Sequence, residues 1–231
     1  MHISDMLVTM KSEVKLLGAW PSPYVLRVRI ALNMKSVKYD FHEEKLSSKS
    51  QLLLQSNPIY KKIPVLIHKD KPLCESLIIV QYVDDVWLSA SPILPSDPYD
   101  RAIARFWTVY IDQTLYPTMR SIRGASEEDE KKRLIEEVRK GLAMLEDVFK
   151  DSSKGKGFYG GDQIGLLDIA LGSFLGWLRV VEIINGVKLL DQNNTPELLK
   201  WAERFCAHSA VKDVMPETGR LLEFSKTLAK G

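Results

Sequence analysis

The sequence contains few residues of the kinds that form disulfide frameworks or metal sites. Its 231 residues include two cysteines, Cys74 and Cys206, and four histidines, and none of these stands in a C-x-x-C pair or at the spacing of a metal-ligand motif. This scarcity disfavours a disulfide-stapled secreted scaffold and a zinc site. We therefore expect a reducing, cytoplasmic compartment and no metal.

An excess of charge of one sign and a long uncharged apolar run are also absent. Lysine and arginine number 32 against 30 aspartates and glutamates, the formal net charge is +2, and the basic residues are dispersed. A nucleic-acid surface needs clustered basic residues, so nucleic acid is not an expected partner. The most apolar stretch, residues 164–184, contains Asp168, Arg179 and Glu182, which a membrane-spanning helix rarely tolerates. We expect no membrane segment, no secretory signal and a flexible extension over residues 1–12.

The first ninety residues alternate short apolar runs with helical patterns, in the order β-α-β-α-β-β-α. Apolar and β-branched runs predict strands at 14–17, 37–41, 65–67 and 72–74, the last two joined as a hairpin. Helical spacing predicts helices that begin near residue 23, over 47–55 and at 75–76, with Ser76 as an N-cap. The first two strands are separated by a helix, which indicates that they are parallel.

Every later segment has a helical pattern. Residues 89–98 are rich in proline and serine, which is typical of a linker. Apolar residues at three-to-four spacing then predict helices at 99–123, 127–150, 165–184, 196–208 and 216–228. We therefore expect an α/β domain over residues 13–88, a linker at 89–98 and an all-α domain over 99–231.

Ser22 stands between Pro21 and Pro23, after the first strand and at the start of the first helix. Proline suits a first helical turn because it lacks an N–H group that would be unpaired there. The remaining free N–H groups and the helix dipole favour a negative charge at this place. Two explanations of Ser22 are open from local sequence: a helix N-cap, or a hydroxyl that holds an anion.

The order of elements brings further polar residues to the same corner. Pro64 opens the third strand beside the Ser22 turn, so Ile63-Pro64 is a candidate cis peptide, with an edge-strand proline as the alternative. Glu75 and Ser76 begin a helix and would suit the ammonium and carboxylate of an amino-acid head group. The alternative is an ordinary helix cap with an acidic first turn.

Lysine and aromatic residues supply two more candidate groups. Lys49 and Lys62 lie in connections that feed the same corner, where they would neutralise a second carboxylate, or they are solvated surface lysines. Tyr116 and Arg120 are four residues apart and share a helix face. With Trp177 they would line a pocket for a flat hydrophobic ligand, or they are ordinary core and surface residues.

Several motifs, taken together in order and spacing, resemble the soluble glutathione transferases, most closely the tau class of plants. The motifs are Trp-Pro-Ser-Pro-Tyr at 20–24, Arg-Val at 27–28, Asn-Pro at 57–58, Lys-Lys-Ile-Pro-Val-Leu at 61–66, Cys-Glu-Ser at 74–76, Leu-Pro-Ser-Asp-Pro-Tyr at 94–99, Phe-Trp at 106–107, Tyr-Gly-Gly-Asp at 159–162 and Asp-Ile-Ala at 168–170. One departure is Gly165, where many members place a serine or threonine N-cap three residues before the aspartate matched by Asp168.

The resemblance implies a thioredoxin-like N-terminal domain, an all-helical C-terminal domain and a homodimer. It implies glutathione as co-substrate, a hydrophobic electrophile as second substrate, and no cofactor. Ser22 would assist the thiol as the catalytic residue, with Arg27 in support. The implied glutathione-binding residues are Ser22, Lys49, Lys62, Ile63, Pro64, Glu75, Ser76 and Asp112. The implied electrophile pocket consists of Trp20, Tyr24, Tyr116, Arg120 and Trp177.

The expected function is conjugation of the glutathione thiolate to hydrophobic electrophiles in detoxification and stress response, with glutathione peroxidase activity as a possible side reaction. The alternative is a non-catalytic carrier of hydrophobic ligands in the helical half. A redox thiol transferase on the same fold would carry cysteine at position 22, where this chain has serine. Without that thiol no mixed disulfide forms there, so this third hypothesis is disfavoured.

Overall fold

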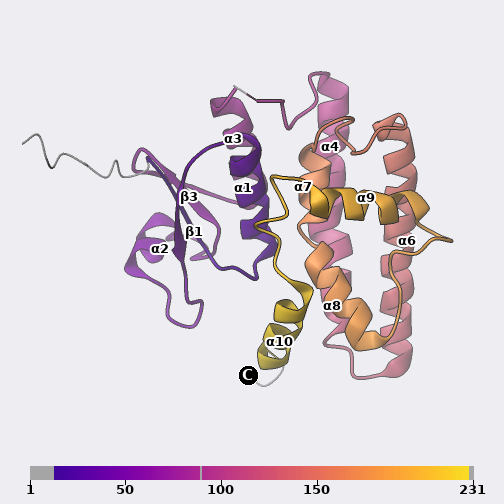
Figure 1. The fold of residues 1–231 in the computed structure, drawn as a ribbon. Coiled ribbons are helices and arrows are strands. Elements are labelled where there is room, and N and C mark those ends of the chain that lie inside the picture. The colour runs from indigo at the N-terminus through magenta and orange to yellow at the C-terminus, as the bar shows by residue number, and fades with distance from the viewer. Residues whose placement is uncertain (1–12, 89, 229–231) are drawn as a thin grey trace, which may run out of the picture.

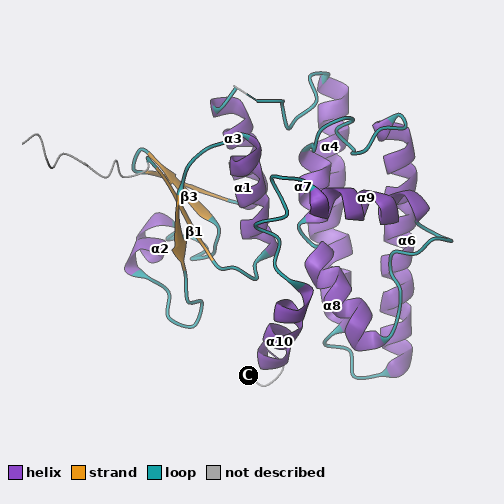
Figure 2. Cartoon of the chain, in the orientation of Figure 1, coloured by secondary structure: helices purple, strands orange, loops and turns teal. Residues whose placement is uncertain are grey.

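The computed structural model describes residues 13–88 and 90–228, and places an α/β half beside an all-helical half (Figure 1). The expected extension over residues 1–12 lies outside the described residues. Figure 2 shows the strands gathered in the N-terminal half and only helices and loops in the other. The expected fold class, a thioredoxin-like domain followed by an all-α domain, is confirmed.

The four strands form one mixed sheet with the order β2-β1-β3-β4. The strands are β1 (Val14–Gly18), β2 (Asp40–Glu43), β3 (Val65–His68) and β4 (Lys71–Cys74). As expected, β1 and β2 are parallel, whereas β3 runs antiparallel to both β1 and β4. A two-residue turn with positive φ at Lys69 and Asp70 joins the β3–β4 hairpin.

Helices cover both faces of the sheet, because β1 and β3 place apolar side chains on both faces. Leu16 and Leu66 belong to the core cluster that includes α1 (Pro23–Met34) and α3 (Ser76–Val86). Leu17 and Val65, which point the other way, pack with Leu53 of α2 (Gln51–Ser56). The sheet therefore presents its strand ends, with the first turns of α1 and α3, at one edge of the domain.

The second strand begins three residues later than the sequence pattern predicts, at residue 40 rather than 37. The end of α1 uses the intervening residues: Ser36 has φ of 54°, and the Val37 N–H donates to the Leu32 carbonyl at 2.9 Å. This geometry closes the helix with a left-handed residue, so Val37 serves the helix end and is not free to pair in the sheet.

The starts of α2 and α3 also differ from expectation. Helix α2 begins at Gln51 rather than 47, because the Ser50 hydroxyl caps it by accepting from the Leu53 N–H at 3.0 Å. Ser76 is not an N-cap. It is the first helical residue, and Glu75 precedes the helix with φ of 70°.

The C-terminal half is helical throughout its described part. Its elements are α4 (Pro98–Tyr110), the π-helix η1 (Ile111–Leu115), α5 (Tyr116–Ile122), α6 (Glu128–Ser153), α7 (Leu166–Gly172), α8 (Leu175–Asn185), α9 (Pro196–Ala207) and α10 (Thr218–Leu228). The helix expected over 99–123 is thus continuous but contains one wide π turn. Such turns are frequent at functional sites because they redirect the side chains that follow.

The single helix expected over 165–184 is wrong, because the chain breaks between α7 and α8 at residues 173–174. The Ala170 carbonyl, which would accept from the Phe174 N–H in a continuous helix, accepts from Arg27 at 3.1 Å and from the Ser173 hydroxyl at 3.0 Å. The Phe174 N–H donates to the Leu171 carbonyl instead. A side chain from the other domain therefore ends this helix.

A buried ion pair holds the connection between the two halves. Lys35 at the end of α1 pairs with Asp84 of α3 at 2.8 Å, and both side chains are buried. Lys35 also donates to the Ser91 carbonyl, and Asp84 accepts from the N–H groups of Ile93 and Leu94. Within the described residues, no helix reaches the length and apolarity that a membrane crossing requires.

Candidate functional site

A cavity of about 780 Å³ lies between the two domains, where the α/β half faces the helical half. The first turns of α1 and α3, the loop before β3, and the η1–α5 region all contribute to its wall. We call it the first cavity. Its lining residues are Ser22, Tyr24, Leu46, Lys49, Asn57, Tyr60, Lys61, Lys62, Ile63, Pro64, Glu75, Ser76, Asp112 and Arg120.

Ser22 is the N-cap of α1 and also borders the first cavity. Its hydroxyl oxygen accepts from the Val25 N–H at 3.3 Å, and its backbone is extended. A serine hydroxyl has one donor and two acceptor positions. Accepting from Val25 therefore leaves the O–H free to donate to an anion, so the capping and anion-binding explanations are compatible.

Arg27 is fully buried and does not line the cavity. Its guanidinium donates to both carboxylate oxygens of Asp112, at 2.9 and 2.5 Å, and to the Ser76 hydroxyl at 3.3 Å. It also donates to Ser173 and Ala170 of the helical half. The rings of Tyr24 and Phe174 lie 5.2 and 4.8 Å from the guanidinium carbon. Arg27 thus positions two cavity residues from behind and ties the domains together.

The sequence did not indicate the part played by residues 170 and 173 in holding Arg27. Ser173 is buried, and its place within an apolar stretch of the sequence is typical of an ordinary small core residue. The one available signal is a single serine in the otherwise apolar run of residues 169–178. Its meaning depends on a partner 146 residues away, which spacing alone does not show.

The loop that leads into β3 is shaped by Asn57, another residue that the sequence patterns left unassigned. This side chain is 4% exposed, donates to the Lys62 carbonyl at 2.9 Å and accepts from the Tyr60 N–H at 3.1 Å. Lys61 has φ of 53°, and the expected Ile63–Pro64 cis peptide is present. The loop therefore carries Lys61, Lys62 and Ile63 to the cavity wall.

The charges around the first cavity are of both signs and come from different elements, with Arg120 of α5 as a further cation. Lys49, Lys61 and Lys62 lie on the side of α2 and the β3 loop, whereas Glu75 and Asp112 lie at the start of α3 and in η1. The Arg27 guanidinium compensates the charge of Asp112. This arrangement suits a zwitterionic ligand that also carries a distant carboxylate. The lysines would bind that carboxylate, and the acid and the free helix N–H groups would bind the zwitterionic end.

Tyr24 and Tyr116 form an aromatic wall with Phe174. Tyr116 stacks on Phe174 with a centroid distance of 3.8 Å, and Tyr24 meets both rings edge-on. Burial raises the pKa of Tyr116 to about 12, and burial with the Asp112 carboxylate nearby raises the pKa of Tyr24. Both phenols therefore remain protonated at neutral pH and act as donors, not as bases.

A second cavity of about 390 Å³ adjoins the first, because Arg120 lines both. We call it the second cavity. Trp177 contributes to its wall and is fixed by donation from its indole N–H to the Pro21 carbonyl at 2.8 Å. Its lining residues are Pro21, Pro23, Tyr116, Met119, Arg120, Arg123, Trp177, Val180, Val181, Ile184, Asn185 and Leu228.

Trp20 does not line either cavity, contrary to the expectation from the resemblance. Its ring packs edge-on against Phe224 at 5.5 Å, and the guanidinium carbon of Arg220 lies 3.8 Å from its centroid. Helix α10 supplies both partners. No sequence pattern indicated that this late helix returns to the start of α1 and covers Trp20.

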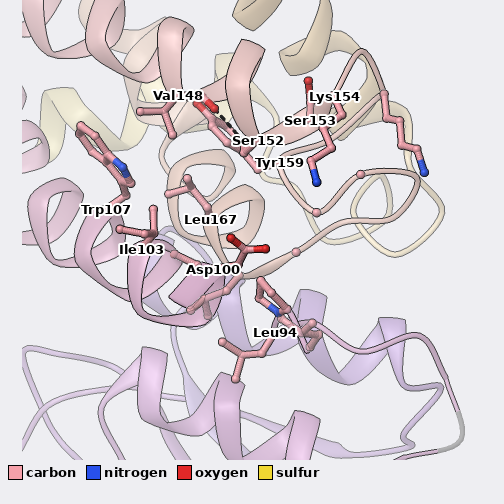
Figure 3. A pocket seen from close by; sticks show the side chains of 18 of the residues that line it. Leu94, Asp100, Ile103, Trp107, Val148, Ser152, Ser153, Lys154, Tyr159 and Leu167 are labelled. Atoms are coloured by element: carbon pink, nitrogen blue, oxygen red, sulfur yellow. Dashed lines mark hydrogen bonds between the residues drawn. The ribbon is translucent and has the colours of Figure 1, made fainter. Parts of the chain in front are cut away.

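A further cavity of about 430 Å³ lies away from this region (Figure 3). Residues 92–96, one side of α4, the end of α6 and residues 154–161 surround it, and Trp107 and Leu167 contribute apolar surface. None of the expected site residues lines it. Among the described residues, no cluster of histidine, cysteine, aspartate and glutamate could hold a metal ion.

Comparison with known families matches both halves of the chain. The model of the glutathione S-transferase N-terminal domain matches residues 12–85, and that of the C-terminal domain matches residues 100–209. Glutathione S-transferase U17 of Arabidopsis thaliana is 59% identical over 218 residues, which cover 94% of this chain and 96% of that protein.

Solved structures agree in fold and in class. The Tau class glutathione S-transferase of mango (Mangifera indica) superimposes with a TM-score of 0.91 at 62% identity, covering 93% of this chain and 98% of that one. A rice glutathione S-transferase, whose structure was determined in complex with glutathione, superimposes with a TM-score of 0.86 at 34% identity, covering 96% of this chain and 100% of that one.

Proposed function

Because the chain belongs to the glutathione S-transferase family, and to its tau class, we propose that the first cavity binds glutathione and that Ser22 stabilises the thiolate. The enzyme then joins the glutathione sulfur to a hydrophobic electrophile. One observation carries the proposal: a single cavity between the two domains collects a free serine O–H with lysines and an acid from different elements. Those residues are Ser22, Lys49, Lys62, Glu75 and Ser76.

The charges of glutathione match the charges of the cavity. We place its γ-glutamyl ammonium at Glu75 and the neighbouring carboxylate at Ser76 and the free N–H groups of α3. The glycyl carboxylate then lies at Lys49 and Lys62. The backbone of Ile63, which precedes cis-Pro64, pairs with the cysteinyl unit between them.

The proposed catalytic role of Ser22 is electrostatic. The thiolate is the nucleophile, and a free thiol has a pKa of about 8.5, so unbound glutathione is mostly protonated at neutral pH. A hydrogen bond to a charged group contributes about 1.5–3 kcal/mol, which lowers the thiol pKa by about one to two units. Ser22 needs only to donate, which its capping geometry permits.

Arg27 is proposed as a positioning residue rather than a catalytic one. It contacts Asp112 and Ser76 but lies behind the cavity wall. Its positive charge, buried near the start of α1, also favours a nearby thiolate. Asp112, held by Arg27, supports the γ-glutamyl head group from the side of η1.

The second cavity is the proposed binding site of the electrophile. It is largely apolar, it adjoins the first cavity at Arg120, and it contains the expected Tyr116 and Trp177. Tyr24 lies in the wall of the first cavity and in edge contact with Tyr116. An electrophile held there would meet the thiolate without diffusing, which supplies the remaining acceleration.

Two subsidiary activities fit the same geometry. A stabilised thiolate would also attack organic hydroperoxides, giving glutathione peroxidase activity. The second cavity, at about 390 Å³, is large enough for a small apolar ligand, which favours a carrier role. Cys74 and Cys206 are both free thiols, which fits the proposed cytoplasmic location.

A homodimer is proposed from an apolar stripe on α3 and α4. Ile78 is 57% exposed, Phe106 is 60% exposed, and Tyr99 and Val109 are also exposed. Clustered exposed apolar side chains of this kind are typical of a surface that another chain covers.

Glutathione binding tests the first cavity directly. We expect the double variant Glu75→Ala/Ser76→Ala to bind glutathione at least tenfold more weakly, since each lost charge-assisted contact contributes about 1.5–3 kcal/mol. Isothermal titration calorimetry measures this, with Glu130→Ala on the exposed surface of α6 as the control. Unchanged affinity in the double variant would exclude the site.

A further inference from the structure

The second cavity carries positive charge without acidic residues. Its lining includes Arg120 and Arg123 but no aspartate or glutamate. In the described part of the chain, arginine ion pairs form at Arg27, Arg133 and Arg139. Arg120 and Arg123 are both exposed and make no ion pair with any residue there, so the cavity wall carries two guanidinium groups that no carboxylate binds directly.

The polar groups near these arginines are also donors. Burial raises the pKa of Tyr116 to about 12, and the charges of Arg120 and Arg123 act on the same hydroxyl to oppose that rise. Tyr116, Arg120 and Arg123 all line the second cavity. The phenol stays protonated at neutral pH and adds an O–H donor to the guanidinium N–H donors. This part of the cavity therefore favours an acceptor with negative charge.

Apart from Asn185, the rest of the wall is apolar, and it includes buried side chains. Met119, Val180 and Val181 are buried, and Pro21 and Ile184 extend the same surface. An ion that is small and strongly hydrated gains nothing from such a wall. A molecule with an apolar or aromatic body and one anionic end gains contacts from both parts.

A simpler explanation of the two arginines comes from their place in the helix. Arg120 lies in the last turn of α5 and Arg123 is its C-cap, where cations stabilise the helix dipole. That explanation accounts for cations at this helix end. The helix dipole does not require that Arg120 and Arg123 line one cavity from which carboxylates are absent. Its interaction with the two arginines affects stability rather than substrate choice.

We propose that the preferred electrophiles of this enzyme are amphipathic carboxylates, with the apolar body on the wall of the second cavity and the carboxylate at Arg123. The inference rests on the proposed glutathione conjugation and names its substrate class. Arg123 is the discriminating residue because it lines only the second cavity, whereas Arg120 also borders the first. A guanidinium matches a carboxylate with two parallel hydrogen bonds.

The test compares a chlorodinitrobenzoate with its methyl ester, the chlorine being para to the carboxyl carbon and flanked by both nitro groups. The thiolate sulfur attacks the carbon that bears chlorine, the C–S bond forms, and chloride leaves with the bonding electron pair. The two compounds share this reacting centre and differ in one negative charge. The measured quantity is the ratio of kcat/KM for the acid to kcat/KM for the ester, after subtraction of the uncatalysed rates.

We expect Arg123→Gln to lower this ratio about three- to tenfold, as for a charge-assisted contact that is partly screened by solvent. Arg123→Lys, which keeps the charge, should retain most of the ratio. Arg133→Gln removes a cation from the exposed surface of α6 and should leave the ratio unchanged. If Arg123→Gln changes the free energy of unfolding but not the ratio, the helix-dipole explanation holds and the inference is wrong.

The two proposals fail in different ways. If the ester is turned over and Arg123→Gln leaves the acid-to-ester ratio of kcat/KM unaltered, glutathione conjugation stands and the carboxylate preference is overturned. If neither compound is conjugated, the proposed function fails, and calorimetric binding of dinitrobenzoate and its methyl ester, which lack the leaving group, decides the inference. Tighter binding of the acid that is lost in Arg123→Gln supports it, and equal binding of acid and ester overturns it.

Discussion

At the scale of single residues, Asp168 is the most constrained acid in the helical half. It is fully buried and accepts from the N–H groups of Tyr159, Gly160 and Gly165 and from the indole of Trp201, at 2.7–3.0 Å. Gly165 has no side chain with which to cap α7, so Asp168 supplies the helix start by reaching back to the Gly165 N–H. The glycine at this position is therefore compatible with the fold.

The pKa of Asp168 predicts a pH dependence of stability. Burial raises this pKa from 3.8 to about 6, although the four hydrogen bonds oppose the rise. Between these values the folded state binds more protons than the unfolded state, so the contribution of Asp168 to stability falls as pH rises from 4 toward 6. The change is about 1 kcal/mol per pH unit and about 3 kcal/mol in total.

Urea unfolding of the parent and of Asp168→Asn at several pH values between 4 and 7 isolates this effect. The variant should have a lower free energy of unfolding, since an amide accepts hydrogen bonds from fewer of the four N–H donors. The difference in unfolding free energy between the two proteins should widen as the pH falls. A difference that stays constant with pH would show that the carboxyl titrates alike in both states.

At the scale of elements, the sequence was a better guide to the presence of helices and strands than to the residues at which they end. The apolar runs of β1 and β3 and the three-to-four spacing in α6 are local properties, and the strands and the helix that they predict are present. The break between α7 and α8 was not predicted, because Arg27 of another domain takes the Ala170 carbonyl. The same reason applies to Trp20, whose position depends on α10.

The helices α7 and α10 offer a matched pair of glycines. A Cβ at Gly172 would stand 2.3 Å from the ring of Phe205, which is buried, whereas a Cβ at Gly219 would meet no atom within 4 Å. We expect Gly172→Ala to lower the free energy of unfolding by about 1–3 kcal/mol through overpacking. Gly219→Ala should raise it by about 0.5–1 kcal/mol, because alanine favours the helix. Denaturant unfolding measures both, and a loss of stability in Gly219→Ala, or none in Gly172→Ala, would contradict this account.

At the scale of the whole molecule, buried polar contacts help to fix the α/β half against the helical half. Arg27 reaches Asp112 and Ser173, and Lys35 with Asp84 holds the connecting segment. The cavity that we assign to glutathione lies between these halves. Its residues come from both domains. The order of elements already brought Ser22, Lys49, Lys62, Glu75 and Ser76 to one corner, whereas Asp112 of the helical half was assigned only through the resemblance.

The proposed dimer surface also belongs to this scale. We expect Phe106→Asp, which places a charge in the exposed stripe on α4, to weaken self-association at least tenfold, because a charge buried in an apolar interface is costly. Sedimentation velocity over a range of concentrations measures the change, with Glu130→Gln as the control. A monomeric parent, or an unaltered dimer in Phe106→Asp, would exclude this surface.

The most direct test of the central claim is the pH profile of glutathione conjugation to a generic aryl halide, for the parent and for Ser22→Ala. We predict that kcat/KM of the parent rises through an apparent pKa about one to two units below that of free glutathione. Ser22→Ala should be about tenfold to a hundredfold slower, with that pKa moved up by a similar amount. Loss of the N-cap alone would lower stability by about 1 kcal/mol and leave the profile in place. Two proteins with the same profile would therefore show that Ser22 only caps the helix, and would contradict the account.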